Sequence, residues 1–584
     1  MPTLQFKGKN IIWNHHLSIP YHTLEEDKKL SFQPEKGEGN LIIEGDNLIA
    51  LKALVPQYTG RIKCIYIDPP YNTGKIGQEW FYNDKVNSPL IKEWFGKEVT
   101  ADDLTKHDKW LCMMAPRLKL LHNLLSENGI IFISIDDNEL YNLRLLMNEI
   151  FGEENYVTTL PTIMNLKGNQ DEFGFAGTHE YTIVWTKEKN KSIFFEYDAV
   201  DEDIEGWQND EVGLYKEGAP LKSTGSESKR EHRRLMFYPI LVNKKDNSVS
   251  TISKQEYAKI YDKTTDSFND GYLKKLSIKY EKEGYYVVLP YTVNKEYGRW
   301  RWGFSEENKL KLRTDVIVKI KDGEISLYKK QRPELSDLIT KKPKSVFYKP
   351  EYSSGNGTNL LKSLLGDKLF NNPKPLELIK DLLILSSKEK DIILDSFAGS
   401  GTTGHAVMDL AKLDKGERKY ILIQMTEATN DNPNKNICKD VTRQRLKRAI
   451  EVNGYDSGFQ YLSVGKPIDA ETILNGELPK YYEFAKYIFY LCTGDNLSEL
   501  KKIKGKDYYV GEFGNQVIYL IYKEDFNSLT KMALTLELAE KFISANPNKR
   551  IIVYAPACFV DQEYLNENQI EFVSIPYNLF QRNK

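Results

Sequence analysis

Cysteines are scarce in this sequence and show no sign of acting together. The 584-residue chain has no CxxC pair and no histidine at metal-ligand spacing from a cysteine; its five cysteines are Cys64, Cys112, Cys438, Cys492 and Cys558. Their scatter argues against a disulfide framework and against a structural zinc site. We therefore expect reduced thiols, no bound metal and a place in the cytoplasm, where thiols stay reduced.

Long apolar runs and repeats are absent as well. The first ten residues, MPTLQFKGKN, do not combine a basic stretch with an apolar segment, and no later run has the length of a membrane span. We therefore expect no targeting peptide and no membrane helix. The lack of a fixed-period repeat excludes solenoids and propellers.

An excess of charge of either sign is also missing. Lys and Arg number 81 against 83 Asp and Glu, which gives a formal net charge of −2. A surface that binds nucleic acid must therefore come from local clusters of basic residues. The composition, with 40% hydrophobic and 28% charged residues, is that of a globular protein. At about 150 residues per domain, the chain should form three or four domains.

Two stretches alternate strand and helix patterns in the manner of a parallel α/β sheet. In the first, from residue 41 to 156, strands are expected in LIIEGDN, RIKCIYI and GIIFISIDD, each followed by a helical pattern. In the second, from residue 346 to 460, strands are expected in DIILDSF and KYILIQM, with helices before, between and after them. We predict that both stretches form one domain, because their motifs complement each other.

The rest of the chain divides around these two stretches. Residues 157–345 are rich in charge and tyrosine and lose the α/β rhythm except in HEYTIVWTK, so we predict a large α+β insertion there. Residues 461–584 show a small α/β pattern of their own. The predicted segments are an N-terminal arm (1–40), two halves of one α/β domain (41–156 and 346–460), the insertion between them (157–345) and a C-terminal interaction module (461–584).

The tetrapeptide Asp68-Pro69-Pro70-Tyr71 directly follows the expected strand IKCIYI, and ligands of open α/β sheets bind at this end of the strands. An adenine amino nitrogen is a poor nucleophile, and acceptors aimed at its two protons direct its lone pair at an electrophile. The Asp68 carboxylate and the rigidly held carbonyl of Pro69 can supply those acceptors. The ring of Tyr71 offers a stacking face for an extruded base. The alternative, an ordinary Asp-Pro-Pro turn, is disfavoured by the longer motif DPPYNTG after a strand.

A second motif, DSFAGSGTT, joins an expected strand to an expected helix and begins at Asp395. Its glycines let the backbone turn tightly and approach a ligand, although a purely structural turn is the plain alternative. The sequence GxxxxGK[ST] of a phosphate-cradling loop is missing, and the next strand is followed by Glu427, where such folds bind ribose hydroxyls. A cofactor with a ribose and no phosphate chain, such as S-adenosylmethionine, fits both observations. Glu427 can equally be an acid of a surface loop.

Together these motifs resemble those of DNA amino-methyltransferases in which the catalytic motif precedes the cofactor motif, the β group. The likeness is carried by IIEGDNLIALKALVPQYTGRIKCIYIDPPYNTG, WLCMMAPRLKLLHNLL, GIIFISIDDNELYNLRLLMNEIFGEENY, HEYTIVWTK, GRWRWG, NPKPLELIK and DSFAGSGTTGHAV. Within this group the chain is similar to the modification (Mod) subunits of type III restriction–modification systems. The resemblance implies a Rossmann-like S-adenosylmethionine-dependent methyltransferase fold in circularly permuted motif order, with a target-recognition domain as the insertion.

The resemblance also implies a reaction and its residues. The implied reaction is methylation of N6 of a flipped adenine in double-stranded DNA, with the residues from Asp68 to Tyr71 as the catalytic motif and S-adenosylmethionine as the methyl donor. Asp rather than Ser at the first position of that motif implies adenine N6 and not cytosine N4. The residues implied in cofactor binding are Asp46, Lys374, Pro375, Asp395, Phe397, Gly399, Gly401 and Glu427. Among them, Asp46 is assigned to the cofactor's adenine, and Lys374 with Pro375 to its methionine end.

Basic residues of the insertion are candidates for DNA contact. They are Arg230, Arg233 and Arg234 in SESKREHRRLMFYPI, and Arg299 and Arg301 in GRWRWG. Arginine can bond bidentately to guanine or clamp a phosphate, and the neighbouring tryptophans can pack or stack. For any single arginine, a solvated charged loop is an equally good interpretation.

Several functions remain possible from the sequence. The leading hypothesis is the modification subunit of a type III-like system, working as a homodimer with a separate restriction subunit, because the chain shows no ATPase P-loop. The alternatives are a solitary DNA adenine methyltransferase, or an amino-methyltransferase that acts on cytosine N4, RNA or protein glutamine. A subunit that only recognises DNA is disfavoured by the intact catalytic and glycine motifs.

Overall fold

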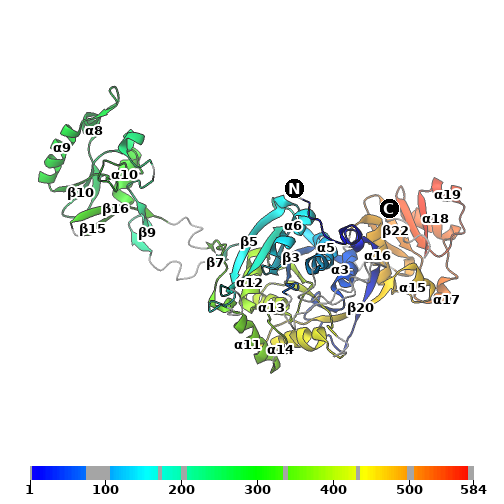
Figure 1. Ribbon diagram of the computed structural model, residues 1–584. Helices are drawn as coiled ribbons and strands as arrows, with labels where there is room; N and C mark the ends of the chain where they lie inside the picture. Colours follow the sequence, from blue (N-terminus) through cyan, green and yellow to red (C-terminus); the bar gives the residue numbers. More distant parts are fainter. Residues whose placement is uncertain are drawn as a thin grey trace. The chain divides into compact units, whose positions relative to one another are not determined.

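The computed structural model describes residues 3–73, 105–168, 174–198, 207–225, 227–321, 323–332, 340–367, 369–428, 434–495, 497 and 505–575. The chain divides into two compact units (Figure 1). Residues 1–195 and 344–584 form the first unit, and residues 196–343 form the second. The second unit therefore interrupts the first in sequence.

A large mixed sheet forms the centre of the first unit. Its strands, in spatial order, are β1 (Tyr21–Glu26), β20 (Gln460–Ile468), β2 (Leu41–Glu44), β19 (Lys419–Gln424), β18 (Ile392–Asp395), β3 (Ile62–Ile67), β4 (Leu125–Ile135), β6 (His179–Thr186) and β5 (Tyr156–Ile163). The strands from β20 to β4 run parallel, whereas β1, β6 and β5 pair antiparallel with their neighbours. The predicted Rossmann-like α/β fold is confirmed.

The two sequence halves interleave in this sheet. Strand β18, from the second half, pairs with β3 of the first half through Ile393 and Cys64. Strand β2, from the first half, lies between β19 and β20 of the second half. The chain proceeds from β18 to β19 in one direction and from β3 to β4 in the other, so the carboxyl ends of β3 and β18 flank the ligand crevice of an open sheet. Both predicted motifs follow these two strands.

Helices cover both faces of the sheet. The helices are α3 (Asn47–Tyr58), α5 (Lys106–Leu124) and α6 (Leu140–Phe151) on one face, and α12 (Leu376–Ser386), α13 (Thr402–Asp414) and α14 (Arg443–Asn453) on the other. Strand β3 is buried at every position, as expected for a strand covered on two sides. A Cβ at Gly404 of α13 would lie 2.9 Å from the Leu422 side chain, so α13 packs closely on β19. Helix α11 (Ser354–Leu365) contacts α14.

Three predicted segment boundaries differ in the structure. Residues 1–40 are not a separate arm, because β1 completes one edge of the sheet and the short helices α1 (Lys9–Ile12) and α2 (His15–Ser18) contact α5. The separate unit begins near residue 196 rather than 157, because β5 and β6 form an antiparallel hairpin on the other sheet edge. Strand β20 also belongs to this sheet, so the C-terminal module starts after residue 468 rather than at 461. The antiparallel edge strands β1 and β5 lack the α/β rhythm that predicts a parallel sheet.

The C-terminal module contains a second, smaller sheet. Its strands are β21 (Tyr509–Phe513), β22 (Gln516–Leu520), β23 (Arg550–Ala555) and β24 (Ile570–Ser574), and its helices are α15 (Ala470–Leu474), α16 (Tyr481–Thr493), α17 (Phe526–Leu529), α18 (Leu536–Ala545) and α19 (Gln562–Glu567). One sheet face packs on α18 around Phe542. The other face shares its core with α16, which contacts α3. The module is thus continuous with the core of the first unit.

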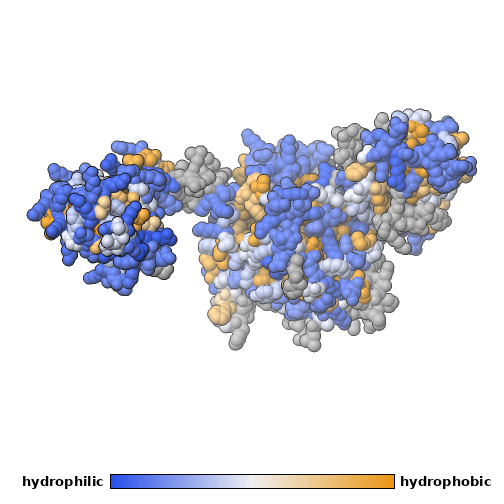
Figure 2. Space-filling view, turned by 90° about the horizontal axis from the view of Figure 1, so that it is seen from above, coloured by the Kyte–Doolittle hydropathy of each residue, from blue (hydrophilic) through white to orange (hydrophobic). Residues whose placement is uncertain are grey.

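The second unit is an α+β fold with its own core. Its strands are β7 (Tyr197–Asp198), β8 (Gln208–Asp210), β9 (Gly213–Pro220), β10 (Ile240–Asn243), β11 (Val249–Thr251), β12 (Tyr261–Asp262), β13 (Ser267–Phe268), β14 (Tyr285–Val288), β15 (Val316–Lys321), β16 (Glu324–Gln331) and β17 (Thr340–Lys341); its helices are α8 (Lys254–Ile260), α9 (Asp270–Lys282) and α10 (Glu306–Thr314). Aliphatic and aromatic side chains, Trp300 among them, form the core. The face of this unit seen in Figure 2 is mostly hydrophilic.

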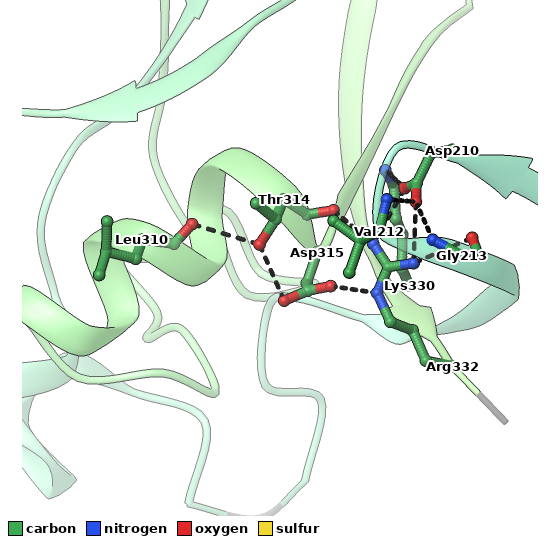
Figure 3. A network of polar contacts seen from close by, with 8 residues as sticks. All are labelled: Asp210, Val212, Gly213, Leu310, Thr314, Asp315, Lys330 and Arg332. Carbon is green, nitrogen blue, oxygen red and sulfur yellow. Dashed lines mark hydrogen bonds and ion pairs between the residues drawn. The ribbon is translucent and has the colours of Figure 1, made fainter. Parts of the chain in front are cut away.

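A charged network ties the two ends of the second unit together. Arg332, near the end of the unit, donates from both terminal nitrogens to Asp210, near its start, at 2.9 Å each (Figure 3). Its Nε donates to Asp315 at 2.7 Å, and Lys330 Nζ donates to Asp210 at 2.5 Å. The two cations hold the pKa of Asp210 well below its usual range. The network joins strand β8 to the end of β16 although more than a hundred residues separate them in sequence.

None of the helices in the described ranges is long and apolar enough to cross a membrane. The same residues hold no group of three or more His, Cys, Asp or Glu side chains that could bind a metal ion.

Candidate active site

The loop after β3 carries the DPPY motif and is held by two buried contacts. The indole Nε1 of Trp110, on α5, donates to the carbonyl of Pro70 at 2.7 Å. Asn72 adopts a left-handed conformation with φ of 57° and donates to the buried carboxylate of Glu139 at 2.5 Å. His107 also bonds Glu139, at 2.7 Å. These contacts fix the backbone on both sides of Tyr71. Gly74, the last residue of the predicted DPPYNTG motif, lies outside the described residues.

Asp68 belongs to a compact cluster of charged and hydroxyl groups. Lys374, just before α12, donates to both carboxylate oxygens of Glu180 on β6, at 2.7 and 2.8 Å, and to the hydroxyl of Tyr71 at 2.6 Å. The Tyr71 hydroxyl in turn donates to Glu180 at 3.1 Å. The Lys374 ammonium lies 3.2 Å from Asp68 Oδ1. That oxygen is buried and accepts no well-aligned hydrogen bond from the described residues.

Burial and neighbouring charge set the ionisation of this cluster. Burial raises the pKa of Tyr71 well above its ordinary value, and the carboxylates of Asp68 and Glu180 raise it further, so Tyr71 stays a neutral phenol. Burial opposes the charge on Lys374, but Asp68 and Glu180 outweigh it and leave its pKa raised. Burial raises the pKa of Glu180 despite the nearby ammonium. The Lys374 side chain is therefore cationic at neutral pH.

The glycine turn follows β18 and opens helix α13. Gly399 and Gly401 both have left-handed backbones, with φ of 51° and 80°. The Gly399 amide donates to Gln424 Oε1 at 2.7 Å, and its carbonyl accepts from the Thr442 hydroxyl at 2.6 Å. Thr402 Oγ1 donates to the main-chain carbonyl of Lys374 at 3.3 Å, so the turn contacts the segment that carries the charged cluster. The structure thus brings the two predicted motifs to one end of the sheet.

Asp395 lies under the glycine turn and not on its surface. Its carboxylate accepts from the amide of Phe397 at 3.0 Å and from the hydroxyl of Thr403 at 2.6 Å. Its side chain is buried, and this burial raises its pKa to about 7 in spite of the two hydrogen bonds. Asp395 therefore stabilises the conformation of the glycine turn from its buried side.

This buried carboxyl gives a pH dependence of stability. Because its folded pKa is raised above the ordinary value, the stability that protonated Asp395 contributes is lost as pH rises through about 7. Asparagine does not titrate, so Asp395→Asn lacks this pH dependence. When the pH is raised from 5 to 8, we expect the Tm of the wild type to fall by about 3 °C or more relative to the Tm of the variant. Differential scanning calorimetry at both pH values measures this. A relative loss by the variant would contradict a carboxyl that burial keeps protonated.

Other predicted cofactor residues surround the turn. Asp46 caps α3 through the amides of Leu48 and Ile49, at 2.8 and 3.3 Å, and lies 3.4 Å from Arg117. The adjacent Asn47 donates to the carbonyl of Ser396 at 3.0 Å, which ties α3 to the glycine turn. The cap of Asp46 places the start of α3 beside the motif.

Two further predicted residues lie at the ends of neighbouring elements. Glu427, after β19, has a φ of 58° and accepts from Gln424 at 3.0 Å and from Lys435 at 3.1 Å. Pro375 occupies the cap position before α12. Both therefore lie close to residues that contact the glycine turn.

Three residues of this region were not assigned to the site from the sequence. Glu180 and Glu139 are described above, and Arg445 lies under the glycine turn, where it donates to Ser400 and Thr402 at 2.8 and 2.7 Å. Arg445 is fully buried, and burial lowers the pKa of its guanidinium to about 9. A charged residue on a basic helix reads as exposed, so only the fold shows that Arg445 supports the turn.

The predicted DNA-contacting arginines fall into two groups. Arg230 is largely buried and bonds Asp270 at 2.6 and 3.0 Å, with the rings of Phe268 and Tyr297 within 4.5 Å of its guanidinium. It therefore holds the unit together. The other four arginines are more exposed, and each contacts another residue of the second unit. Arg233 lies 3.9 Å from Glu227, and Arg234 pairs with Asp266. Arg299 donates to the Glu227 carbonyl and Arg301 to the Pro220 carbonyl. Trp300, expected to pack or stack, packs in the core.

We expect Arg230→Ala to destabilise the second unit by about 2 kcal/mol, because it leaves Asp270 without its partner and removes the cation between two rings. Hydrogen exchange of residues 207–332 should speed up accordingly. Arg233→Ala, whose side chain is 62% exposed, is the matched control and should leave exchange unchanged. Equal exchange in both variants would show that Arg230 does not support this fold.

The sequence of the chain matches a known protein family. The DNA methylase family (N6_N4_Mtase) matches residues 62–431, and the chain belongs to this family. The EcoPI Mod subunit of a type III restriction–modification enzyme, from Escherichia phage P1, is 42% identical over 71% of this chain and 62% of its own length. The EcoP15I Mod subunit from Escherichia coli is 32% identical over 76% of this chain and 68% of its own length. The type II methyltransferase M.KpnI from Klebsiella pneumoniae is 30% identical over 69% of this chain and 84% of its own length.

Proposed function

We propose that this protein is an S-adenosylmethionine-dependent DNA methyltransferase that methylates N6 of an adenine flipped out of duplex DNA. The observation that supports this most is Asp68 Oδ1, a buried acceptor with no well-aligned hydrogen bond from any described residue. It follows β3, the direct neighbour of the strand that leads into the glycine turn. Family membership and the two motifs support the same reaction.

The chemistry of the target follows from the acceptors. In this proposal, one amino proton of adenine bonds the Asp68 carboxylate and the other bonds the carbonyl of Pro69. These bonds turn the nitrogen lone pair out of conjugation and toward the methyl group. Positive charge grows on this nitrogen during transfer, and the Asp68 carboxylate stabilises it. Tyr71, neutral and held by Lys374 and Glu180, offers its ring to the flipped base.

The residues around the crevice fit S-adenosylmethionine, which supplies an electrophilic methyl group on a sulfonium centre. The left-handed Gly399 and Gly401 let the backbone approach a ligand, and Glu427 after β19 can accept from the ribose hydroxyls. Phe397 and Asp46 are proposed for the cofactor's adenine, and Pro375 for its methionine end. The residues proposed to line this cofactor site are Asp46, Lys374, Pro375, Phe397, Gly399, Gly401 and Glu427, and Asp395 supports the site from beneath the glycine turn. Lys374 would contribute through its main chain, because its ammonium is engaged by Glu180 and Tyr71.

The proposal is tested by identifying the methylated base. DNA from cells that express the chain, and from cells that express Asp68→Ala, is digested to nucleosides for mass spectrometry and read by single-molecule sequencing. We expect N6-methyladenine at one sequence motif, only with the wild type. N4-methylcytosine would favour that alternative, and an absence of any methylated base in the DNA would contradict the proposal.

We further propose that the second unit recognises the target sequence and that the protein works as a homodimer with a restriction subunit. The names of the EcoPI and EcoP15I relatives support a type III system. The likeness to M.KpnI, which covers more of that protein's length, supports the alternative of a methyltransferase that works without such a partner. A cleavage assay on unmethylated DNA separates these two possibilities. Cleavage that requires both this chain and a co-purified partner would support the type III system. The C-terminal module is proposed as the contact to a second copy or to that partner.

A further inference from the structure

The Lys374 ammonium lies between the carboxylates of Glu180 and Asp68 but interacts with them differently. It donates to both oxygens of Glu180 at 2.7 and 2.8 Å, whereas it lies 3.2 Å from Asp68 Oδ1 without a well-aligned hydrogen bond. All three side chains are at least partly buried, with exposed fractions of 10% for Lys374, 13% for Glu180 and 28% for Asp68. The cation therefore hydrogen-bonds Glu180, whereas with Asp68 it forms an ion pair without a well-aligned hydrogen bond.

This asymmetry matters for an acceptor that must receive a substrate amino group. A lysine that hydrogen-bonded Asp68 would occupy the oxygen that the base needs, and it would cancel the charge that stabilises the positive nitrogen. In a site shielded from water, such an ion pair is also strong and hard to break. Some second anion must hold the ammonium if Asp68 is to stay available.

We propose that Glu180 is a positioning residue that draws the Lys374 ammonium away from Asp68 and so keeps Asp68 available to the amino group of the target base. The proposal rests on the function proposed above and adds a residue to it. Its role is indirect, because Glu180 acts on Lys374 and Tyr71 and not on the base.

The surrounding structure fixes Glu180 for this role. Its strand, β6, pairs with β4 and β5, and Glu180 lies opposite Thr162 of β5. The Tyr71 hydroxyl accepts from Lys374 and donates to Glu180, which closes a triangle of hydrogen bonds. Thr402 donates to the backbone carbonyl of Lys374, and the Lys374 ammonium lies within 3.2 Å of both carboxylates. Without the charge of Glu180, Asp68 is the carboxylate left for it.

The test is a double-mutant cycle at saturating DNA and methyl donor. Glu180→Gln keeps the shape of the side chain but removes its charge, and we expect single-turnover methyl transfer to fall by about 10- to 100-fold. Adding Lys374→Met removes the ammonium that has moved onto Asp68, so the double variant should be at least about fivefold faster than Glu180→Gln alone. A purely structural role predicts the reverse, because the second change would only add damage. A double variant no faster than Glu180→Gln overturns the proposal.

Two controls complete the experiment. Glu127→Gln removes the charge from an exposed Glu–Lys pair, which Glu127 forms with Lys191 at 2.8 Å, and it should leave the rate unchanged. The cofactor Kd and Tm of each variant show whether the change reached beyond the transfer step; if Glu180→Gln does not fold, Glu180→Asp, which keeps the charge, should keep most of the rate.

A crystal structure of Glu180→Gln gives a readout that does not depend on activity. We expect the Lys374 ammonium to move from 3.2 Å to about 2.8 Å from Asp68 Oδ1 and to donate a hydrogen bond to it. An ammonium that stays beside residue 180 would refute the role of Glu180 even if the wild type methylates adenine. A wild type that methylates no adenine would contradict the proposed function, whatever the lysine does.

Discussion

Replacing Asp68 by alanine is expected to lower methyl transfer to DNA by about a thousand-fold or more, with little change in the affinity for DNA or methyl donor. The carboxylate is the acceptor that turns the amino lone pair toward the methyl group and stabilises the charge that grows on nitrogen. It contributes nothing to the phosphate contacts that dominate DNA affinity. The rate is measured with a methyl-labelled donor under single-turnover conditions, and binding by fluorescence anisotropy.

Asp456→Ala provides the matched control for this variant. The side chain of Asp456 is 89% exposed and its ion pair with Lys36 is on the surface, so its removal should leave the rate unchanged. A rate for Asp68→Ala within about tenfold of the wild type would be inconsistent with an acceptor role worth several kcal/mol. Loss of rate together with loss of DNA binding would instead indicate a folding defect.

The second large effect is expected at the glycine turn. Gly399 has a left-handed backbone, and a Cβ there would lie 3.0 Å from the ring of Phe370. Its backbone cannot shift easily, because the amide and carbonyl are both hydrogen-bonded, to Gln424 and Thr442. We expect Gly399→Leu to raise the Kd of S-adenosylmethionine by about 100-fold or more, since both the strain and the side chain fall where the cofactor would approach. Isothermal titration calorimetry measures this.

Gly454→Leu separates strain from loss of the binding site. Gly454 ends helix α14 with a similar φ of 64°, but nothing lies within 4 Å of a Cβ there. Gly454→Leu should lose about 1 kcal/mol of stability, the same loss that backbone strain causes in Gly399→Leu. It should still bind the cofactor with the affinity of the wild type. Equal cofactor affinities in the two variants would argue against the proposed cofactor site.

The central sheet could be predicted from the sequence because its elements carry strong local patterns. The parallel strands are almost continuously apolar, and the pattern in LYNLRLLMNEIF marks α6 residue for residue. Strands β1, β5 and β20 could not be placed from the sequence. The edge strands β1 and β5 are antiparallel and mix polar and apolar residues, and β20 mixes them as well, although it pairs parallel with β2. In addition, β1 pairs with β20, more than 400 residues away in sequence.

The site was only partly predictable for the same reason. Asp68 and the glycines belong to motifs whose chemistry is readable in short segments. Glu180 is an acid at the start of a strand and reads as exposed until the sheet brings it to Lys374, 194 residues away in sequence. For Arg230 the prediction differed in the opposite direction. It belongs to a basic cluster that was predicted to bind DNA, but in the structure it bonds Asp270 within the second unit.

The interleaved order of the central sheet has a consequence for how the protein is made. Strands β2 and β3 are synthesised early, but in the sheet they are separated by β19 and β18, which end at Gln424 and Asp395. At synthesis rates of about 5–20 residues per second, the ribosome needs tens of seconds to reach those strands. During that time β3 has an unpaired edge on that side, which can pair with other chains. Protection of this edge of β3 against pairing with other chains is therefore expected to raise the yield of folded protein.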